Sequence, residues 1–296
     1  MSSVSKFTFV ILHYISEFET YACINSIISN CINVDYDIVV IDNNSPNRSG
    51  YYLSKKYKNN NRVTIISNSS NLGFARGNNV GIAYAIDHFM PDFIVVLNND
   101  VEINQSNFTT LIKQEYKRSH FSVLGPQIVN LDGDTDRYSF IPVTATALIG
   151  QIVTNYTKII LIRIGVYMKY LNFKRRSREK QANLNKKKLQ RHEGVVLQGS
   201  CLIFAKKYFS EYREGFDPRT FMYKEEQLLY IRLKSRDLIS IYNPSIKVLH
   251  KAEVSTKLAT GSEDRKLLFL YTNQLRSSFV LLPELIKIKI RGYKNA

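Results

Sequence analysis

Clusters of Asn and Asp close two strongly apolar stretches of this 296-residue chain. The run "IVVLNND" ends in Asn98, Asn99 and Asp100, and the run "IVVIDNN" ends at Asp42 and Asn44. A turn would explain such endings, because Asn and Asp are common turn residues. Oxygen atoms gathered at the end of a strand could equally hold a ligand. The elements around them decide between the two explanations.

Glycines recur at intervals of four in "NLGFARGNNVG", at Gly73, Gly77 and Gly81. This spacing is neither that of a dinucleotide-binding turn nor that of a phosphate-binding loop. On a helix it leaves one bare stripe, which a nucleotide or another backbone can approach closely. Tight helix packing is the structural alternative.

The elements that must position these residues alternate between strands and helices. Strands are predicted at 7–14, 36–45, 62–67 and 92–100, and helices at 17–32, 50–58 and from residue 71 onward. Apolar strands alternating with helices predict an α/β fold with a mostly parallel sheet covered on both faces. Functional residues of such sheets collect at the carboxyl ends of the strands. Asp42 and Asp100 both occupy such ends, which favours a binding role for Asp100.

Composition fits a folded, reduced protein with one unusual charged segment. The chain is 44% hydrophobic and carries a formal charge of +16, and its three cysteines show no metal-ligand spacing. No stretch of about 18 uncharged apolar residues occurs, so no membrane span is expected.

The order of these motifs resembles glycosyltransferase family 2 enzymes of the GT-A fold. The resemblance rests on "VILHY", "VVIDNNS", "NLGFARGNNVG" and "VVLNND", covers residues 7–130 and resumes at 195–255. It is closest to the rhamnosyltransferase-like branch that builds bacterial surface polysaccharides, such as capsule or O-antigen.

This resemblance implies which residues bind the donor. The nucleotide is expected to contact Tyr14, Asp42, Asn44, Gly73, Arg76, Gly77, Asn78, Asn98 and Asn99. Asp100 closes the segment that matches the family's D-x-D motif, and with His250 it is expected to hold Mg²⁺ or Mn²⁺. A divalent cation would stabilise the charge that develops on the diphosphate leaving group.

The acceptor side is expected to include Gly199 and Ser200 and an acidic pair, Glu225 and Glu226. Inverting displacement needs a carboxylate to take the proton of the attacking hydroxyl, and the resemblance assigns this role to Glu226. The alternative is the solvated first turn of a helix, where acids are favoured by the helix dipole. Leu228 stands where the family pattern has a further acid.

A basic segment follows an amphipathic one. Ten Lys or Arg and one acid, Glu179, lie between Lys169 and Arg191, which gives this stretch +9 of the total +16. The preceding residues 147–172 place Gln151, Asn155 and Lys158 on one helical stripe and are otherwise mainly apolar. An apolar helix face followed by a polybasic run is typical of an interfacial membrane anchor. Residues 174–191 lack aromatics, which disfavours nucleic-acid binding; a helix packed on the catalytic domain with a solvated loop is the other alternative.

The sequence therefore predicts four segments: 1–142 and 195–256 as the nucleotide-sugar and acceptor halves, 143–194 as a basic insertion, and 257–296 as a helical basic tail. The expected function is inverting transfer of a sugar from a UDP- or dTDP-sugar to a glycan or lipid-linked acceptor. The expected location is the cytoplasmic face of an anionic membrane, with no nucleic-acid partner. A metal-dependent nucleotidyltransferase and a non-catalytic basic protein binding a membrane or nucleic acid remain as alternatives.

Overall fold

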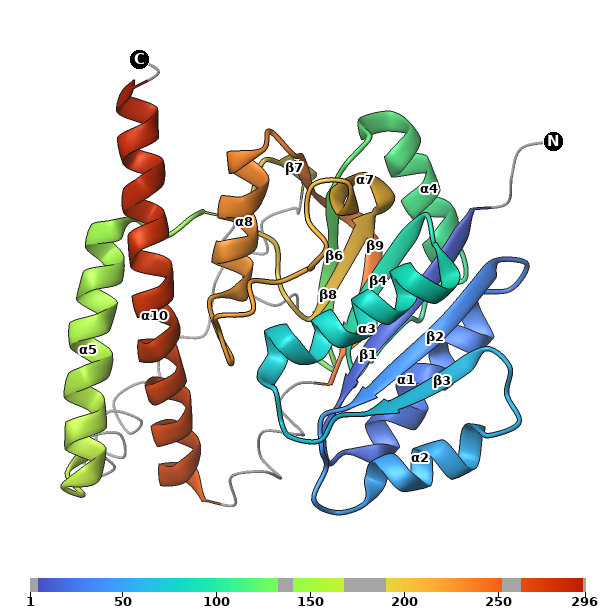
Figure 1. The fold of residues 1–296 in the computed structure, drawn as a ribbon, viewed down its shortest axis with the longest axis horizontal. Helices are drawn as coiled ribbons and strands as arrows, with labels where there is room; N and C mark the ends of the chain where they lie inside the picture. The colour runs from blue at the N-terminus through green and yellow to red at the C-terminus, as the bar shows by residue number, and fades with distance from the viewer. Residues whose placement is uncertain (1–4, 133–140, 168–189, 252–261, 295–296) are drawn as a thin grey trace.

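A computed structural model describes residues 5–132, 141–167, 190–251 and 262–294 (Figure 1). Its elements run in the order β1 (Lys6–His13), α1 (Glu17–Asn30), β2 (Asp35–Asp42), α2 (Ser49–Tyr57), β3 (Val63–Ser67), α3 (Gly73–Phe89), β4 (Phe93–Asn98), β5 (Val101–Glu102), α4 (Phe108–Ser119), β6 (Val123–Asn130), α5 (Ala145–Arg163), β7 (His192–Glu193), β8 (Cys201–Ala205), α7 (Lys206–Phe209), α8 (Glu225–Ser235), β9 (Ser240–His250) and α10 (Glu263–Lys294).

The strands form one sheet in the order β3-β2-β1-β4-β8-β6-β9-β5, and β7 pairs with β9. The first four strands are parallel, as predicted. Beyond β4 both kinds of pairing occur: β6 pairs parallel with β9, whereas β8 pairs antiparallel with both β4 and β6, and β5 and β7 pair antiparallel with β9. The α/β class is confirmed, and the sheet is mixed.

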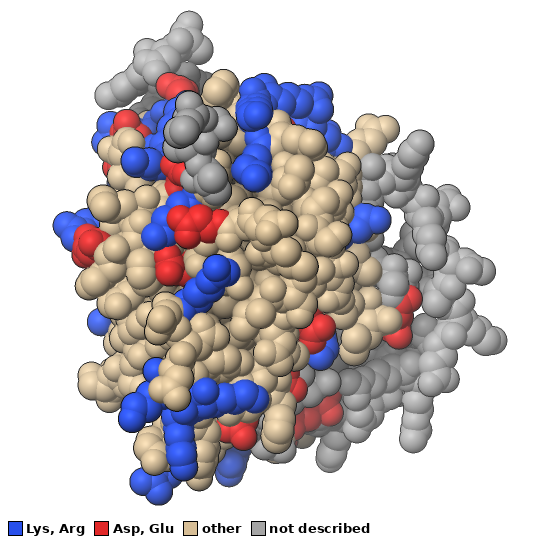
Figure 2. Space-filling view, turned by 90° about the vertical axis from the view of Figure 1, so that its right-hand side faces the viewer, with Lys and Arg blue, Asp and Glu red and all other residues tan. Residues whose placement is uncertain are grey.

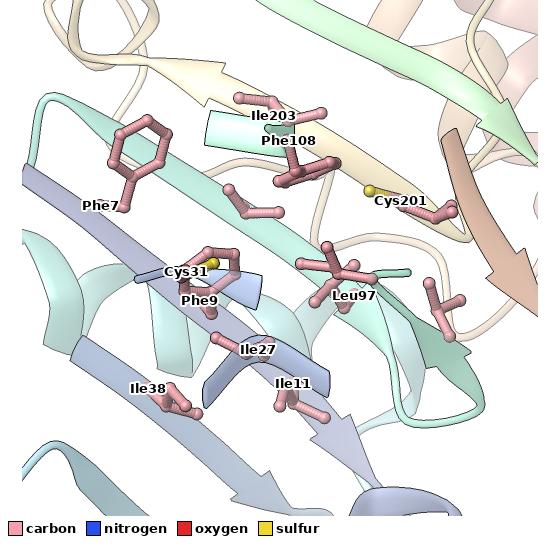
Figure 3. Packing of buried hydrophobic residues seen from close by; sticks show 14 of the residues in the cluster. Phe7, Phe9, Ile11, Ile27, Cys31, Ile38, Leu97, Phe108, Cys201 and Ile203 are labelled. Carbon is pink, nitrogen blue, oxygen red and sulfur yellow. The ribbon is translucent and has the colours of Figure 1, made fainter. Parts of the chain in front are cut away.

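Apolar side chains on both sides of each central strand explain the two covered faces. In β1, Phe7, Phe9 and Ile11 join a core with α1, α2 and α4, whereas Val10 joins the opposite core with α3, α7 and α8. Alternate residues of a strand point to opposite faces, so both sets must be apolar. Figure 3 shows the first core, in which the β1 side chains lie close to Ile27 and Leu97.

The glycine stripe of α3 packs on the sheet. An added Cβ at Gly77 would lie 2.6 Å from Leu12 Cδ1, and one at Gly81 would lie 2.5 Å from Val10 Cγ1. Both distances are too short for real side chains. Gly77 and Gly81 therefore serve close helix–sheet contact, the structural alternative stated above.

The helices α5 and α10 form a pair beside the sheet layers, next to α8 (Figure 1). Leu148 of α5 and Leu281 of α10 pack with Leu228 and Ile231 of α8 in a third apolar cluster. Leu228 is buried in this cluster, so the position where the family pattern has an acid is covered here by apolar side chains. A carboxylate at that position would be desolvated without compensation.

The helix α5 is amphipathic, as predicted, and the structure shows which of its two stripes is packed against the protein. Its polar stripe faces the interior of the assembly: Asn155 is buried and donates to Gln274 of α10, and Lys158 lies over the Tyr271 ring. A second, apolar stripe is exposed, formed by Ile149, Val153, Tyr156, Ile160 and Ile164. The helix is also long and apolar enough to cross a membrane, by length and composition alone, contrary to the expectation of no such segment.

Most of the basic run lies outside the described residues. Arg191, its last member, is described and forms an ion pair with the buried Glu115, with 2.9 Å between Nη2 and Oε1. This arginine ties the end of the segment to α4 and is therefore not available to a partner surface.

Candidate active site

The carboxyl ends of β1, β2 and β4 meet at one edge of the sheet. In the strand register His13 lies beside Asp42, and Leu12 lies beside Asn98. Tyr14 follows His13 directly, so the strands bring three of the predicted donor-binding residues to a common edge. Asn44 lies just beyond β2 and is exposed at a positive φ of 62°, a conformation that Asn tolerates.

Asp42 is buried and held in place by the loop that follows it. Its Oδ1 accepts hydrogen bonds from the Ser45 hydroxyl at 2.6 Å and the Ser45 backbone N–H at 3.1 Å. An added Cβ at Gly50 would overlap the Asp42 carboxylate, so α2 can pass over it only with glycine there.

A chain of polar side chains that the sequence analysis assigned no role supports this edge. His13 is fully buried; Nδ1 shares a hydrogen bond with Thr20 Oγ1 at 2.7 Å and Nε2 with Ser49 Oγ at 2.8 Å. Burial lowers the pKa of His13 to about 4, against an opposing effect of Asp42, so the imidazole is neutral near pH 7. Asn99 is buried and donates to the same Thr20 hydroxyl at 3.1 Å. Its amide thus points into this network.

Asn43 is a second residue that the sequence analysis did not select. Its amide nitrogen donates to Asn71 Oδ1 at 2.9 Å and to the Gly73 carbonyl at 3.2 Å, and its Oδ1 accepts from Leu72 N at 3.0 Å and from Asn68 Nδ2 at 3.1 Å. The buried amide thus fixes the loop that leads into α3. No spacing signal in the sequence distinguishes it from the neighbouring Asn.

The structure brings Asp100 and His250 together from strands far apart in the chain. Residues Val101 and His250 are paired between β5 and β9, and His250 Nε2 lies 3.3 Å from Asp100 Oδ1. Asp100 is only 7% exposed. A carboxylate oxygen and an imidazole nitrogen side by side are suitable ligands for Mg²⁺ or Mn²⁺. Within the described ranges no group of three or more His, Cys, Asp and Glu gathers, so positions for water or for phosphate oxygens of a substrate would remain on such an ion.

The first turn of α3 is fixed to the acceptor side of the site. Gly73 has φ +78°, and an added Cβ there would overlap the carbonyl oxygen and ring of Phe221. The same Phe221 carbonyl accepts from Phe74 N at 2.7 Å. Gly73 is therefore required both by its backbone conformation and by close approach. Arg76 is exposed on the next part of this turn, and Asn78 is buried and bonded to the Phe74 carbonyl.

Residues 217–226, here called the acid loop, are held by three helices. Phe221 contacts α3, the Met222 carbonyl accepts from Ser277 Oγ of α10 at 2.8 Å, and Lys224 Nζ donates to Gln151 Oε1 of α5 at 2.8 Å. Tyr223 and Lys224 have positive φ values of 72° and 70°. Such strain persists only where the surroundings enforce it, and it occurs often at functional sites.

The Glu226 carboxyl lies against the backbone of Gly199, which adjoins the donor side of the site. An added Cβ at Gly199 would lie 2.8 Å from Glu226 Oε1. The backbone carbonyl of the next residue, Ser200, accepts a hydrogen bond from Asn98 N at 3.0 Å. The antiparallel pairing of β8 with β4 creates this arrangement. The predicted base and the predicted donor motif are therefore neighbours, although 128 residues separate Asn98 from Glu226 in the sequence.

Burial raises the pKa of both carboxyl groups of the acidic pair. Desolvation, with a smaller contribution from Glu226, raises the pKa of Glu225 from 4.5 to about 8. Desolvation also raises the pKa of Glu226, but its own N–H, the Gly199 backbone and the Lys224 cation oppose that rise. Glu225 therefore stays protonated near pH 7, while Glu226 has neighbours that favour its charged form, a division of roles common in acid–base sites.

Comparison with known proteins shows the family of this chain. The profile described as Glycosyl transferase family 2 matches residues 8–213. An N-acetylglucosaminyl-diphospho-decaprenol L-rhamnosyltransferase of Mycobacterium tuberculosis is 28% identical over 228 residues, which are 74% of this chain and 67% of that protein. A low-salt glycan biosynthesis hexosyltransferase, Agl10, of Haloferax volcanii is 30% identical over 97 residues, 33% of this chain and only 30% of that protein.

Solved structures show the same fold. S. aureus TarS 1–349 in complex with UDP-GlcNAc has a TM-score of 0.55 at 13% identity, covering 95% of this chain and 71% of that one. GalNAc-T7 with UDP, GalNAc and Mn²⁺ has a TM-score of 0.56 at 13% identity, covering 86% of this chain and 45% of that one. The extent of the profile match settles the classification: this chain belongs to glycosyl transferase family 2.

Proposed function

We propose that this family 2 glycosyltransferase moves a hexose from a nucleoside diphosphate donor to a lipid-linked glycan acceptor with inversion at the anomeric carbon. The observation that carries the proposal is the contact of the Glu226 carboxyl with Gly199, next to the residue bonded to Asn98. It places one ionisable carboxylate beside the donor motif, where an acceptor hydroxyl would attack.

The chemical step needs only one proton acceptor from the protein. The acceptor oxygen attacks the anomeric carbon, its bond to the nucleoside diphosphate breaks, and Glu226 takes the hydroxyl proton as the new bond forms. The electron pair of the broken bond leaves with the diphosphate. Glu225 is buried and protonated near neutral pH, so Glu226 is the one negative charge of the acidic pair. A single carboxylate beside a neutral acid is a common arrangement in acid–base sites.

Asp100 and His250 are the residues that would hold a divalent cation. When bound, such an ion neutralises the charge that develops on the diphosphate. The paired carboxylate and imidazole fit Mg²⁺ or Mn²⁺, and the small number of protein ligands leaves positions for phosphate oxygens. Tyr14, Asp42 and Asn44 are the residues proposed to contact the nucleoside, because they lie at the same sheet edge.

The relatives support a proposal for the donor and acceptor classes. TarS has been solved with UDP-GlcNAc, and the mycobacterial relative is named for a sugar linked through diphosphate to decaprenol. We propose by analogy a UDP- or dTDP-hexose donor and an acceptor of the same lipid-diphosphate class. Bacterial surface polysaccharide synthesis, such as that of capsule or O-antigen, is the process that would use such a reaction.

We further propose that α5 rests on the cytoplasmic face of an anionic membrane. Its exposed stripe of Ile149, Val153, Tyr156, Ile160 and Ile164 has no apolar cover within the described residues, and the +9 basic run follows it in the sequence. Apolar contact and attraction to anionic lipid act together in peripheral anchors, at about 1 kcal/mol per basic residue. Polar contacts of Asn155 and Lys158 with α10 favour an interfacial position over a span through the bilayer.

A nucleic-acid partner is not proposed. Figure 2 shows the face over the first half of the sheet, where Lys and Arg form separate groups with wide uncharged areas between them. On this face the described residues form no continuous basic stripe, which is the usual footprint of binding to a phosphate backbone.

Transfer with a matched carboxylate control tests the reaction. Glu226→Gln should lower turnover roughly 10²- to 10⁴-fold, the range for loss of a general base, and should keep nucleotide binding. Glu211→Gln removes an exposed carboxylate and should transfer at the wild-type rate. Full activity of the Glu226 variant would exclude it as the base.

Vesicle binding tests the membrane proposal. Ile164 and Ile32 are 63% and 68% exposed, so aspartate at either site should be tolerated by the fold. Ile164→Asp should weaken binding to anionic vesicles at high salt, where the electrostatic part is screened, and Ile32→Asp should not. Equal binding of both variants and the wild type would contradict the proposed contact.

A further inference from the structure

A polar cavity separates the exposed stripe of α5 from the acidic pair. It has a volume of about 570 Å³ and lies between α5, α10 and the acid loop. Its lining includes Gln151, Thr154, Asn155, Lys158 and Lys224, and none of its lining residues is acidic.

The two lysines in this cavity make close contacts with neutral groups, and Lys224 is also attracted by the charge of Glu226. Lys158 Nζ lies 4.6 Å from the centroid of the Tyr271 ring, and Lys224 Nζ donates to the Gln151 carbonyl. In the part of the chain that the structure describes, neither ammonium group forms an ion pair with a carboxylate. Burial lowers the pKa of Lys224, and the charge of Glu226 opposes this fall. A bound anion would stabilise the charged form of Lys224, because it would replace part of the solvation lost on burial.

A second cavity of about 480 Å³, lined by residues of α8 and the last part of α10, differs in this respect. Its Arg219 is bonded to Asp217 at 2.6 Å and to Glu284 at 3.0 Å. The positive charge there is already neutralised by the protein, so that cavity offers no comparable site for an anion.

The position of the polar cavity fits one part of a lipid-linked acceptor. Lys224 directly precedes Glu225 and Glu226, so one end of the cavity adjoins the proposed base. The cavity is lined on α5 by Gly150, Gln151 and Lys158. The exposed apolar stripe of the same helix, which includes Ile149 and Val153, lies beside these residues. A group bound here would therefore lie between a lipid surface and the attacking hydroxyl.

We infer that this cavity binds the diphosphate that joins the acceptor sugar to its lipid, with Lys158 and Lys224 neutralising the phosphate charge. The inference rests on the proposed function, because a lipid-linked acceptor has such a group one sugar ring away from the hydroxyl that is glycosylated. Gln151, Thr154 and Asn155 add polar atoms around the phosphate oxygens. Charge-assisted hydrogen bonds of this kind are stronger than those between neutral groups.

Vesicle binding in the absence of donor and divalent ions tests the site. The full chain is sedimented with neutral phosphatidylcholine vesicles that contain either a polyprenyl diphosphate or phosphatidylglycerol, matched in surface charge. The wild type should prefer the diphosphate about tenfold, the effect of one additional strong contact. Lys158→Gln should abolish most of this preference, and Lys158→Arg, which keeps the charge, should retain it.

A charge-matched control separates the cavity from general electrostatics. Arg163→Gln removes one positive charge from the exposed side of α5, outside the lining of the cavity, and should keep the diphosphate preference. Equal loss of preference in the Lys158→Gln and Arg163→Gln variants would overturn the inference, as would binding to phosphatidylglycerol as tight as to the diphosphate. Competition by free pyrophosphate would show that the head group, not the lipid chain, is recognised.

The outcome is independent of sugar transfer. If transfer from a nucleotide sugar is never detected but the Lys158-dependent preference holds, the proposed function fails and the anion site stands. If transfer is detected but Lys158→Gln has the same acceptor KM as Arg163→Gln, the site is wrong and the proposed function stands.

Discussion

Protonation of Glu225 has a consequence for stability that can be measured directly. The carboxyl is 3% exposed, and its Oε1 has no hydrogen-bond partner among the described residues. Glu225→Gln keeps the shape of the neutral acid and removes the group that must ionise. The variant should therefore be more stable than the wild type at alkaline pH.

The magnitude follows from the pKa. The unfolded chain releases this proton near the ordinary value of 4.5, whereas the folded protein keeps it up to about 8. Between these pH values the folded state binds more protons than the unfolded state, so the free energy of unfolding falls as pH rises. At about 1.4 kcal/mol per pH unit the full cost above pH 8 is about 5 kcal/mol.

Urea unfolding at several pH values tests this reasoning. The free energy of unfolding of Glu225→Gln minus that of the wild type should be near zero below pH 4.5, grow through neutral pH and level off above pH 8. Glu211→Gln, at an exposed site, should show no comparable trend. A difference that is constant with pH, or a wild type that gains stability relative to the variant on the alkaline side, would refute a protonated Glu225.

Further predictions concern two glycines and Asp100. Gly73→Ala should destabilise the fold by about 3 kcal/mol or more, because alanine is strained at this positive φ and its Cβ would overlap Phe221. Gly150→Ala, at an open helical position, should stabilise the fold by about 0.5–1 kcal/mol. Thermal unfolding of the two variants measures both effects. Asp100→Asn should remove the Mn²⁺-dependent part of the thermal stabilisation by UDP or dTDP while leaving the metal-independent part. An unchanged Mn²⁺ increment would contradict a metal role for Asp100.

The first half of the fold and the donor edge were predictable from local sequence patterns. Fully apolar strands reveal a sheet covered on both faces, and the polar residues at the ends of β2 and β4 mark the edge at which we propose that the donor binds. These signals are local, since each strand and its ending lie within about ten residues. The predicted positions of Asp42, Asn98 and Asp100 agree with the structure for this reason.

The remaining features depend on long-range pairing. The contact of Asp100 with His250 arises from the pairing of β5 with β9, and that of Glu226 with Gly199 from the packing of α8 near the start of β8. Neither leaves a periodic signal in the sequence. The roles of His13 and Asn43 depend on hydrogen-bond partners in other elements, which residue type and spacing do not reveal.

The orientation of α5 shows the same limitation. Helical periodicity correctly grouped Gln151, Asn155 and Lys158, but a polar stripe on a surface helix is normally expected to face water. Here α10 and Lys224 offer polar partners to that stripe. Only the partner helix decides which stripe is exposed.

Helix α8 is buried on two opposite sides, and this has an evolutionary consequence. Leu229 and Leu233 pack with the sheet, whereas Leu228 and Ile231 pack with α5 and α10. The α5–α10 pair is joined to this region by Leu228 and Ile231, and also by the hydrogen bonds of Gln151 and Ser277 to Lys224 and Met222, just before the acidic pair. A change in the two helices would therefore be transmitted to the two carboxyl groups. The helix pair and the acidic pair are expected to evolve together.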